Sequence, residues 1–301
     1  YQVGQHGEEI GKVAIPISGD YTTQTSLIVD TNGTATVALN NGAITFHRFE
    51  SGAKEAGVSG SLLSLPNQLF AGDSSEHYVV AGGSPSFDTH GVLSRVAVDG
   101  TLERSSNQIP DLDGGSGLIG LTSQEQAGYS LLAKQPGVAG GYRVLRYDRD
   151  LEPQWALPLP RSLPLANPKL VSDDTGRLLV AEMFGDDEPA AVGLYAAGVD
   201  GSSLFSFVLP SGGDQPSNVL MTTQRGTSRA WLHVDGLQLD SKSEAAPHYL
   251  AEVDLEAATC TTHEYGALDA ESKNDLLVAP DGSLFMLTDA ALVRFDEVTE
   301  E

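Results

Sequence analysis

The stretch "PDGSLFMLTDAALVRFDE", from Pro280 to Glu297, reads as a turn followed by two short strands joined by a second tight turn. Runs of apolar and aromatic residues bounded by Gly, Pro and Asp are typical of β-strands. A two-stranded hairpin alone is only marginally stable in water. The stretch must therefore pack against other strands, and the rest of the chain should supply them.

The same hairpin pattern recurs along the chain. Each copy has a β-rich run, a connector and a second run that ends in or near an acidic residue; the copies span 30–50, 74–100, 126–150, 173–201 and 228–256. A further short apolar run precedes most copies, at Leu27–Val29, Leu118–Leu121, Leu170–Val171, Val219–Met221 and Leu276–Val278. Copies that recur about every 50 residues indicate a chain built from repeated supersecondary units.

Proline marks the same place in successive units. An aliphatic residue followed by proline recurs 44 to 50 residues apart, at Ile15-Pro16, Leu65-Pro66, Ile109-Pro110, Leu159-Pro160 and Leu209-Pro210. The next expected position holds Tyr265-Gly266 instead. Because proline lacks the N–H that a central strand must donate, it belongs at strand ends and on edge strands. The pattern therefore predicts that each proline closes the outermost strand of its unit.

Four antiparallel strands in a unit of 40–50 residues are typical of a β-propeller blade. Six blades fit within one domain covering residues 1–301, and the two joints that lack proline leave seven blades as the alternative. The last unit stops after its hairpin, while Lys12–Ile17 precedes the first complete unit. We therefore expect Lys12–Ile17 to supply the outer strand of the last blade, which would remove an exposed sheet edge.

The stretch "LFMLTDAALVRFDE" resembles the repeat of six-bladed propellers of the NHL and gluconolactonase-like type. In those proteins a strand ending near Asp is followed by a turn and a strand ending in Phe-Asp. The resemblance implies a six-bladed all-β fold. Gluconolactonase-like enzymes bind a divalent cation through a Glu, an Asn and an Asp, but no residue here matches those motifs, so none is carried over.

Composition narrows the classes of partner. The net charge is −24, from 41 acidic and 17 basic residues, which disfavours nucleic acid and anionic membranes because both need clustered Lys and Arg. No apolar run reaches the ~20 residues of a membrane span. A single cysteine, Cys260, excludes an intramolecular disulfide, and we expect it to be a buried small hydrophobe. The chain begins at Tyr1, so removal of a leader is a hypothesis that would make the protein periplasmic or secreted.

The middle connectors of units two to five are long, whereas those of units one and six are tight. Long loops on a rigid scaffold are where binding groups are usually placed. We therefore predict a ligand or partner surface on these connectors, facing a protein, a small molecule or a carbohydrate. The candidate binding residues are His90, Asp186, Asp187, Glu188, Asp235, Asp240 and His248.

A second candidate site lies where the loops between units lead into the innermost strands. These loops carry Asp20, Asp111, Asp113, Asp214 and Asp269. Carboxylates gathered around an axis would favour Ca²⁺, which takes six to eight oxygen ligands. In the alternative interpretation these side chains point outward into water, as Asp in turns commonly does.

No nucleophile elbow, zinc-protease motif, Walker loop or complete calcium loop is present. Catalysis usually needs a convergent acid–base or nucleophilic set, and the sequence offers none. Two functional hypotheses remain. The first is a non-catalytic propeller that binds a ligand or partner; the alternative is a divalent-metal-dependent hydrolase or lyase of the lactonase-like propeller type.

Overall fold

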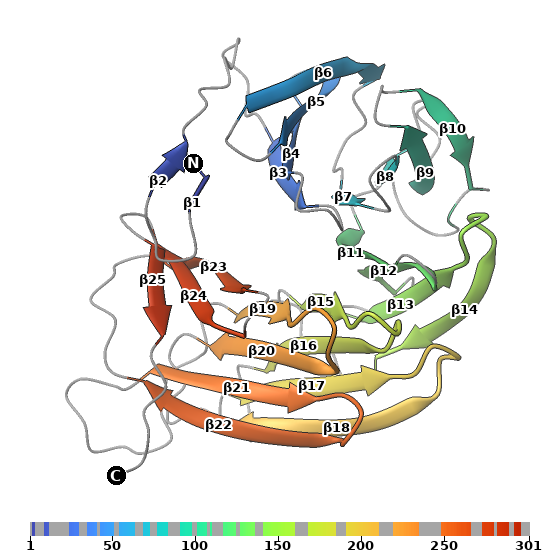
Figure 1. Ribbon diagram of the computed structural model, residues 1–301. Coiled ribbons are helices and arrows are strands. Elements are labelled where there is room, and N and C mark those ends of the chain that lie inside the picture. The colour runs from blue at the N-terminus through green and yellow to red at the C-terminus, as the bar shows by residue number, and fades with distance from the viewer. Residues whose placement is uncertain are drawn as a thin grey trace. The chain divides into compact units, whose positions relative to one another are not determined.

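The computed structural model describes most strands and the tight turns between them (Figure 1). The described residues are 2–3, 9–11, 24–29, 35–40, 43–50, 54–63, 69–72, 77–83, 91–97, 101–106, 109, 117–124, 127–135, 141–159, 168–184, 191–210, 219–234, 248–265, 273–279, 282–288 and 292–295. All of these ranges are strands, turns or short connections, and none is helical. No helix long and apolar enough to cross a membrane occurs among them. The expected all-β class is confirmed.

The sheets follow the order of the chain. Five have four strands, in the orders β3-β4-β5-β6, β7-β8-β9-β10, β11-β12-β13-β14, β15-β16-β17-β18 and β19-β20-β21-β22. A three-stranded sheet, β23-β24-β25, and a two-stranded one, β1-β2, complete the described set. Every pairing with a described register is antiparallel. This repeated four-stranded meander is a propeller-like architecture.

The chain divides into two compact units, and the first covers residues 1–136 and 147–154. Its strands are β1 (Gln2–Val3), β2 (Glu9–Gly11), β3 (Gln24–Val29), β4 (Ala35–Asn40), β5 (Ala43–Glu50), β6 (Lys54–Leu63), β7 (Leu69–Gly72), β8 (His77–Gly83), β9 (Gly91–Ala97), β10 (Leu102–Ser105), β11 (Leu118–Gln124) and β12 (Gly128–Lys134). The sequence repeats contain the hairpins β4–β5 and β8–β9, as predicted. The inner strand β7 was missed, because "LFAG" is too short and too glycine-rich to stand out.

The second unit covers residues 137–146 and 155–301. It holds most of β13 (Tyr142–Tyr147) and β14 (Pro153–Pro158), followed by β15 (Lys169–Ser172), β16 (Leu178–Phe184), β17 (Ala191–Ala197), β18 (Ser203–Pro210), β19 (Val219–Thr223), β20 (Arg229–Val234), β21 (His248–Asp254), β22 (Thr259–Tyr265), β23 (Lys273–Val278), β24 (Leu284–Thr288) and β25 (Leu292–Phe295). The stretch from Pro280 to Glu297 contains the hairpin β24–β25, whose first strand pairs with β23, as expected.

The proline pattern marks the ends of outer strands. Pro210 is the last residue of β18 and pairs with Ala191. The residue before each of two other prolines lies beyond the end of its outer strand but still bonds to the third strand: Ile109 bridges to Gly91, and the N–H of Leu159 donates to the carbonyl of Tyr142. Lys12–Ile17 lies outside the described residues, so the blade count and the closure of the last sheet stay predictions.

The largest described core lies between two neighbouring sheets of the second unit (Figure 1). Alternate residues of β16, among them Leu179 and Ala181, face alternate residues of β20, among them Ala230 and Leu232. Side chains of a strand alternate between its two faces, so each sheet buries one full row in this core. Cys260 is half-buried against the same core, and burial raises the pKa of its thiol, as expected for a residue that packs rather than reacts.

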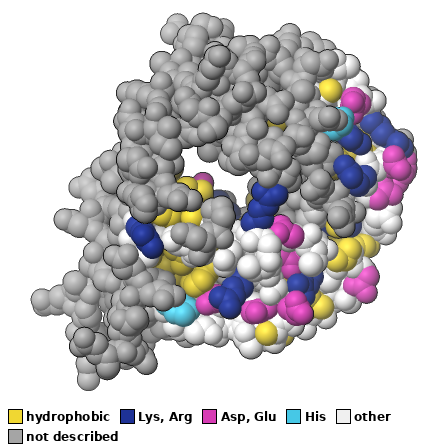
Figure 2. Space-filling view, viewed as in Figure 1, with side chains coloured by type: hydrophobic (Ala, Val, Ile, Leu, Met, Phe, Trp, Pro, Cys, Tyr) yellow, Lys and Arg dark blue, Asp and Glu magenta, His cyan; other side chains and the backbone are white. Residues whose placement is uncertain are grey.

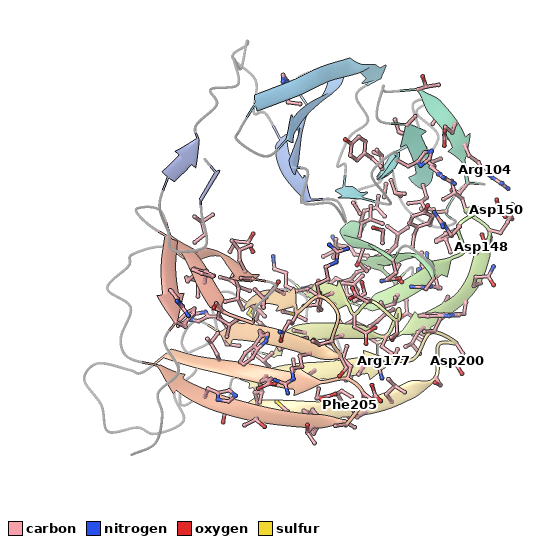
Figure 3. All side chains as sticks on the ribbon, in the orientation of Figure 1. Arg104, Asp148, Asp150, Arg177, Asp200 and Phe205 are labelled. Carbon is pink, nitrogen blue, oxygen red and sulfur yellow. The ribbon has the colours of Figure 1, made fainter. Side chains whose placement is uncertain are left out.

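The turns between first and second strands, and between third and fourth strands, gather at one edge of each sheet, which we call the turn edge. Ion pairs there join neighbouring sheets within a unit: a nitrogen of Arg104 lies 2.8 Å from an oxygen of Asp150, and one of Arg177 lies 3.4 Å from an oxygen of Glu256. Arg104 and Asp150 are labelled in Figure 3. Acidic and basic side chains lie next to one another on the described part of the face in Figure 2. Since most of these groups are exposed, each pair contributes little to stability.

Candidate functional site

The opposite edge of each sheet, which we call the looped edge, carries the connector between the second and third strands. In the β15–β18 sheet, Phe184 at the end of β16 pairs with Ala191 at the start of β17, and Ala191 pairs with Pro210 at the end of β18. In a four-stranded meander the connector that leaves the fourth strand therefore starts at the same edge. Two of the four connections of each repeat therefore meet there.

Connector length at the looped edge differs between sheets. The connectors β4–β5 and β24–β25 are short, covering 41–42 and 289–291. The other four middle connectors are longer and cover 84–90, 135–141, 185–190 and 235–247. The predicted asymmetry of loop length is confirmed by these strand boundaries.

All of the predicted site residues except His248 fall on connections between strands. Outside the described residues are the binding candidates His90, Asp186, Asp187, Glu188, Asp235 and Asp240, and the metal candidates Asp20, Asp111, Asp113, Asp214 and Asp269. His248 is the first residue of β21, where its backbone pairs with Tyr265. Within the described ranges, no group of three or more His, Cys, Asp or Glu is placed to hold a metal ion. The proposed sites thus remain untested by the structure.

The described residues add a buried carboxyl at the looped edge. Glu182 lies two residues before the end of β16 and pairs with Gly193 on β17. Its side chain is completely buried, and neither carboxylate oxygen has a hydrogen-bond partner among the described residues. Burial raises the pKa of Glu182 from 4.5 to about 7, because a charge is poorly solvated in an apolar interior. At neutral pH this carboxyl therefore exists in both protonation states.

Glu182 faces the strands of β13 and β14 rather than the large core. Its neighbours Leu179 and Ala181 belong to the core with β20, so Leu178, Val180 and Glu182 occupy the other face of β16. Tyr142, the first residue of β13, is 4% exposed. The pKa of its phenol is raised mainly by burial, and to a lesser extent by the negative charge of the nearby Glu182 carboxylate. Tyr142 therefore stays a neutral hydroxyl beside Glu182 in the physiological range.

A cavity of about 240 Å³ lies on this same face of the β15–β18 sheet. Its walls are mainly apolar, from Val144, Leu159, Leu178 and Val180, with the hydroxyl-bearing residues Tyr195, Ser203 and Ser206 on the outer strands. Arg146 on β13 is 2% exposed, and burial lowers the pKa of its guanidinium. Two ionisable side chains are thus buried in one packing layer, which is uncommon in a propeller held together by apolar contacts.

A second group of polar side chains lies on β20 and its neighbours. His233, one residue before the end of β20, is completely buried, and Trp231 packs against His263 with ring centroids 5.6 Å apart. Glu252 belongs to the same group. Its carboxylate oxygens lie 3.3 Å from Nε2 of His263 and 3.0 Å from a guanidinium nitrogen of Arg229. His47 on β5 and His233 on β20 are both buried strand residues.

Sequence reasoning passed over Glu182 and Tyr142. The available signal was the single acidic residue in "LLVAEMF", the only charged position of an otherwise apolar strand. Such a residue reads as an ordinary outward-facing side chain unless the strand is known to be covered on both faces. Tyr142 gave no signal, because its relation to Glu182 depends on which two sheets pack together.

The arrangement can hold and release a proton near neutral pH. A carboxyl with a pKa of about 7, set beside a neutral phenol, is suited to general acid–base chemistry or to binding a hydrogen-bonding ligand group. Perturbed carboxyls also occur at purely structural positions, so this feature alone does not identify a reaction. It identifies the looped edge of the second unit as the chemically distinctive region among the described residues.

Comparison with known proteins supports the fold. No protein-family model and no curated protein matches the sequence. Among solved structures, the periplasmic gluconolactonase of Pseudomonas aeruginosa matches with a TM-score of 0.56 and 15% identity, over 88% of this chain and 79% of that one. At this identity the likeness concerns the fold alone, and it supports a propeller-like all-β architecture.

Two further structures match more weakly. An apocarotenoid oxygenase mutant from Synechocystis has a TM-score of 0.49 and 11% identity, over 87% of this chain and 65% of the oxygenase, so this chain spans less than two thirds of that protein. A protein of unknown function from Bacteroides caccae has a TM-score of 0.47 and 12% identity, over 80% of this chain and 81% of that one.

Proposed function

We propose that this chain is a non-catalytic propeller that binds a ligand or protein partner at its looped edge. The observation that carries the proposal is the difference in middle connectors: four are long and two are short on otherwise repeated four-stranded sheets. A rigid sheet framework with variable loops at one edge is the usual design of a binding scaffold. The partner would be a protein, a small molecule or a carbohydrate.

The polar groups of the second unit support this location. An unpaired buried carboxyl costs several kcal/mol when ionised, by general estimates for buried charges. Glu182 lies close to the looped edge, whereas the turn edge satisfies its acidic side chains through its own backbone and arginines. A destabilising group is more readily retained where it serves binding.

We propose that the connections between successive sheets bind a calcium ion. Asp20, Asp111, Asp113, Asp214 and Asp269 would contribute oxygen ligands around the convergent ends of the inner strands. Calorimetric titration with Ca²⁺ tests this idea, with the Asp111→Asn/Asp214→Asn variant as the comparison. No heat in the wild type, or the same isotherm in the variant, would remove calcium from the proposal.

The proposed architecture is six blades, the last completed by Lys12–Ile17. Removal of residues 1–18 should then expose the edge of the last sheet and lower the melting temperature strongly. An unchanged melting temperature would disprove closure. We further propose that the protein is periplasmic or secreted, which fractionation of the native cells would test.

A crystallographic fragment screen tests the binding proposal without knowledge of the ligand. We expect the bound fragments to cluster at the looped edge, where the connectors 185–190 and 235–247 begin and end. Replacing 235–247 by a two-residue Asn-Gly turn should preserve folding and remove fragments from the β19–β22 sheet. Fragments gathered at the turn edge, or retained by the shortened variant, would contradict the proposal.

Hydrolysis or lyase chemistry with a divalent metal is the second candidate. It is favoured by a carboxyl poised to exchange a proton near pH 7, together with a fold like that of a gluconolactonase. Sugar lactones, esters and uronate-containing oligosaccharides should be assayed with and without EDTA. Turnover that needs metal and falls in Glu182→Gln would place this candidate first.

A further inference from the structure

The outermost strand of the β15–β18 sheet differs from the other outer strands of the second unit. β18 reads SLFSFVLP and carries no charged residue. By contrast, β14 begins and ends with proline and β22 contains His263 and Glu264. Charged side chains and proline are the usual means by which an outer strand avoids pairing with another chain. β18 lacks charge along its length and has proline only at its last position.

Apolar side chains of β18 are open to water. Val208 is 63% exposed and Leu204 is 41% exposed, and Ser206 between them is also exposed. Phe205 and Phe207 alternate with these residues and pack against the large core, with ring centroids 5.1 Å apart. The strand is therefore held firmly by one face while the other presents an apolar row. No described strand pairs with its outer side.

The distribution of charge indicates which partner could pair with the outer side of β18. Residues 201–213 are all uncharged, while the whole chain carries a net charge of −24. Two copies of so acidic a chain repel one another over most of their surfaces. A long neutral segment is where two copies can approach without bringing carboxylates together.

The order of residues in β18 is also self-complementary. In an antiparallel pairing of two copies centred on Ser206, Leu204 faces Val208 of the other copy, and Phe205 faces Phe207. Both pairings occur twice because of the two-fold axis. A register moved by one residue in each strand would instead set Val208 against Ser206, which matches an apolar side chain with a hydroxyl. The irregularity opposite Ala196 and Ala197 bends only the start of β18, leaving Phe205–Pro210 in regular register with β17.

We propose that β18 is a homodimerisation strand, which pairs with β18 of a second copy to form one continuous eight-stranded sheet. Cross-strand apolar pairs and the new backbone hydrogen bonds would stabilise the dimer. The interface lies along the outer strand and leaves the looped edge open, so it is independent of the proposed binding function.

Sedimentation equilibrium tests the proposal over a wide range of protein concentration. The wild type should dimerise reversibly, and Val208→Lys should weaken self-association by about tenfold or more, since the pairing would bury an unpaired charge. Thr261→Lys on the exposed part of β22 is the matched control, because it changes the net charge equally. An effect of net charge alone would appear in both variants. Far-ultraviolet circular dichroism and thermal melting confirm that each variant folds.

Disulfide trapping tests the register. In a Cys260→Ser background, Ser206→Cys should give a covalent dimer on mild oxidation, since directly opposed residues of antiparallel strands have α-carbons about 4.5–5.5 Å apart, a distance that a disulfide spans. Thr261→Cys should remain monomeric. A wild type that stays monomeric at the highest concentration overturns the proposal. So does a dimer that Val208→Lys leaves intact and that Ser206→Cys does not trap.

Discussion

The indole of Trp155, on β14, lies directly against Gly201, in the turn between β17 and β18. A β-carbon added at Gly201 would lie 2.9 Å from Cδ2 of Trp155. The indole Nε1–H also donates a hydrogen bond to the carbonyl of Val199, at 2.8 Å. One aromatic side chain therefore fastens two neighbouring sheets at the turn edge, and it requires a residue without a side chain opposite it.

This contact predicts that two glycines respond differently to the same substitution. Gly201 and Gly226 both have positive φ, at 80° and 75°, so alanine is strained at either position by about 1 kcal/mol. At Gly226 no atom lies within 4 Å of the added β-carbon, whereas at Gly201 the indole must move. Gly201→Ala should therefore lower the free energy of unfolding by about 1 kcal/mol more than Gly226→Ala, as measured by urea denaturation.

A double-mutant cycle assigns the difference to the indole. In a Trp155→Ala background the space beside Gly201 is open, so Gly201→Ala should cost about as much as Gly226→Ala. The coupling energy between positions 155 and 201 is the measured quantity. Additive effects of Trp155→Ala and Gly201→Ala would show that the indole does not constrain the turn.

A second prediction concerns the turn between β15 and β16. The buried carboxylate of Asp173 accepts four hydrogen bonds: from the N–H and hydroxyl of Thr175 at 2.9 and 2.7 Å, and from the N–H and Nε of Arg177 at 2.9 and 2.7 Å. Asp173→Ala leaves these donors without their acceptor, and we expect it to destabilise the fold by about 3 kcal/mol. Chemical denaturation measures the loss.

Asp200 provides the matched control for Asp173. It also closes a turn, by accepting hydrogen bonds from the N–H and hydroxyl of Ser202 at 3.0 and 2.6 Å, but it lies on the surface. Water can replace an exposed acceptor, so Asp200→Ala should be clearly milder than Asp173→Ala. Equal losses would mean that burial does not set the strength of these turns.

The architecture of the sheets could be predicted from sequence because its signals are local. Turn residues, β-rich runs and a proline near the end of most outer strands all report on a few neighbouring positions, and they located hairpins such as β16–β17 and β24–β25. The short inner strand β7 escaped because four residues carry too weak a pattern. The proposed closing strand, Lys12–Ile17, depends on a pairing between distant parts of the chain, which no local pattern specifies.

The candidate site could be predicted only in part. Connector lengths follow directly from the spacing of strands, so the long connections after β8, β12, β16 and β20 were foreseen. The buried polar groups were not, because the environment of Glu182 depends on the packing of β13 and β14 over β16. A glutamate in a strand looks the same in sequence whether it faces water or a second sheet.

The last prediction follows from the pKa of Glu182, which is about 7 in the folded protein against 4.5 for an ordinary glutamate. Between these two values the folded state binds more protons than the unfolded state, so stability falls as the pH rises. The loss is complete above pH 7 and amounts to about 3 kcal/mol, since each unit of pKa difference is worth about 1.4 kcal/mol. Burial away from water is the cause of this raised pKa, because an ionised carboxylate is poorly solvated in the interior.

Glu182→Gln removes this titration while keeping the shape of the side chain. The variant should therefore show a flatter dependence of unfolding free energy on pH between 4.5 and 8, and should exceed the wild type most clearly at pH 8. Glu256→Gln, at an exposed carboxyl 75% accessible to water, is the control for the removal of one carboxylate from the same unit. Urea denaturation at a series of pH values measures all three proteins. If Glu182→Gln kept the slope of the wild type, then Glu182 would titrate normally, and its carboxyl would have to be reached by water or by a cationic partner in solution.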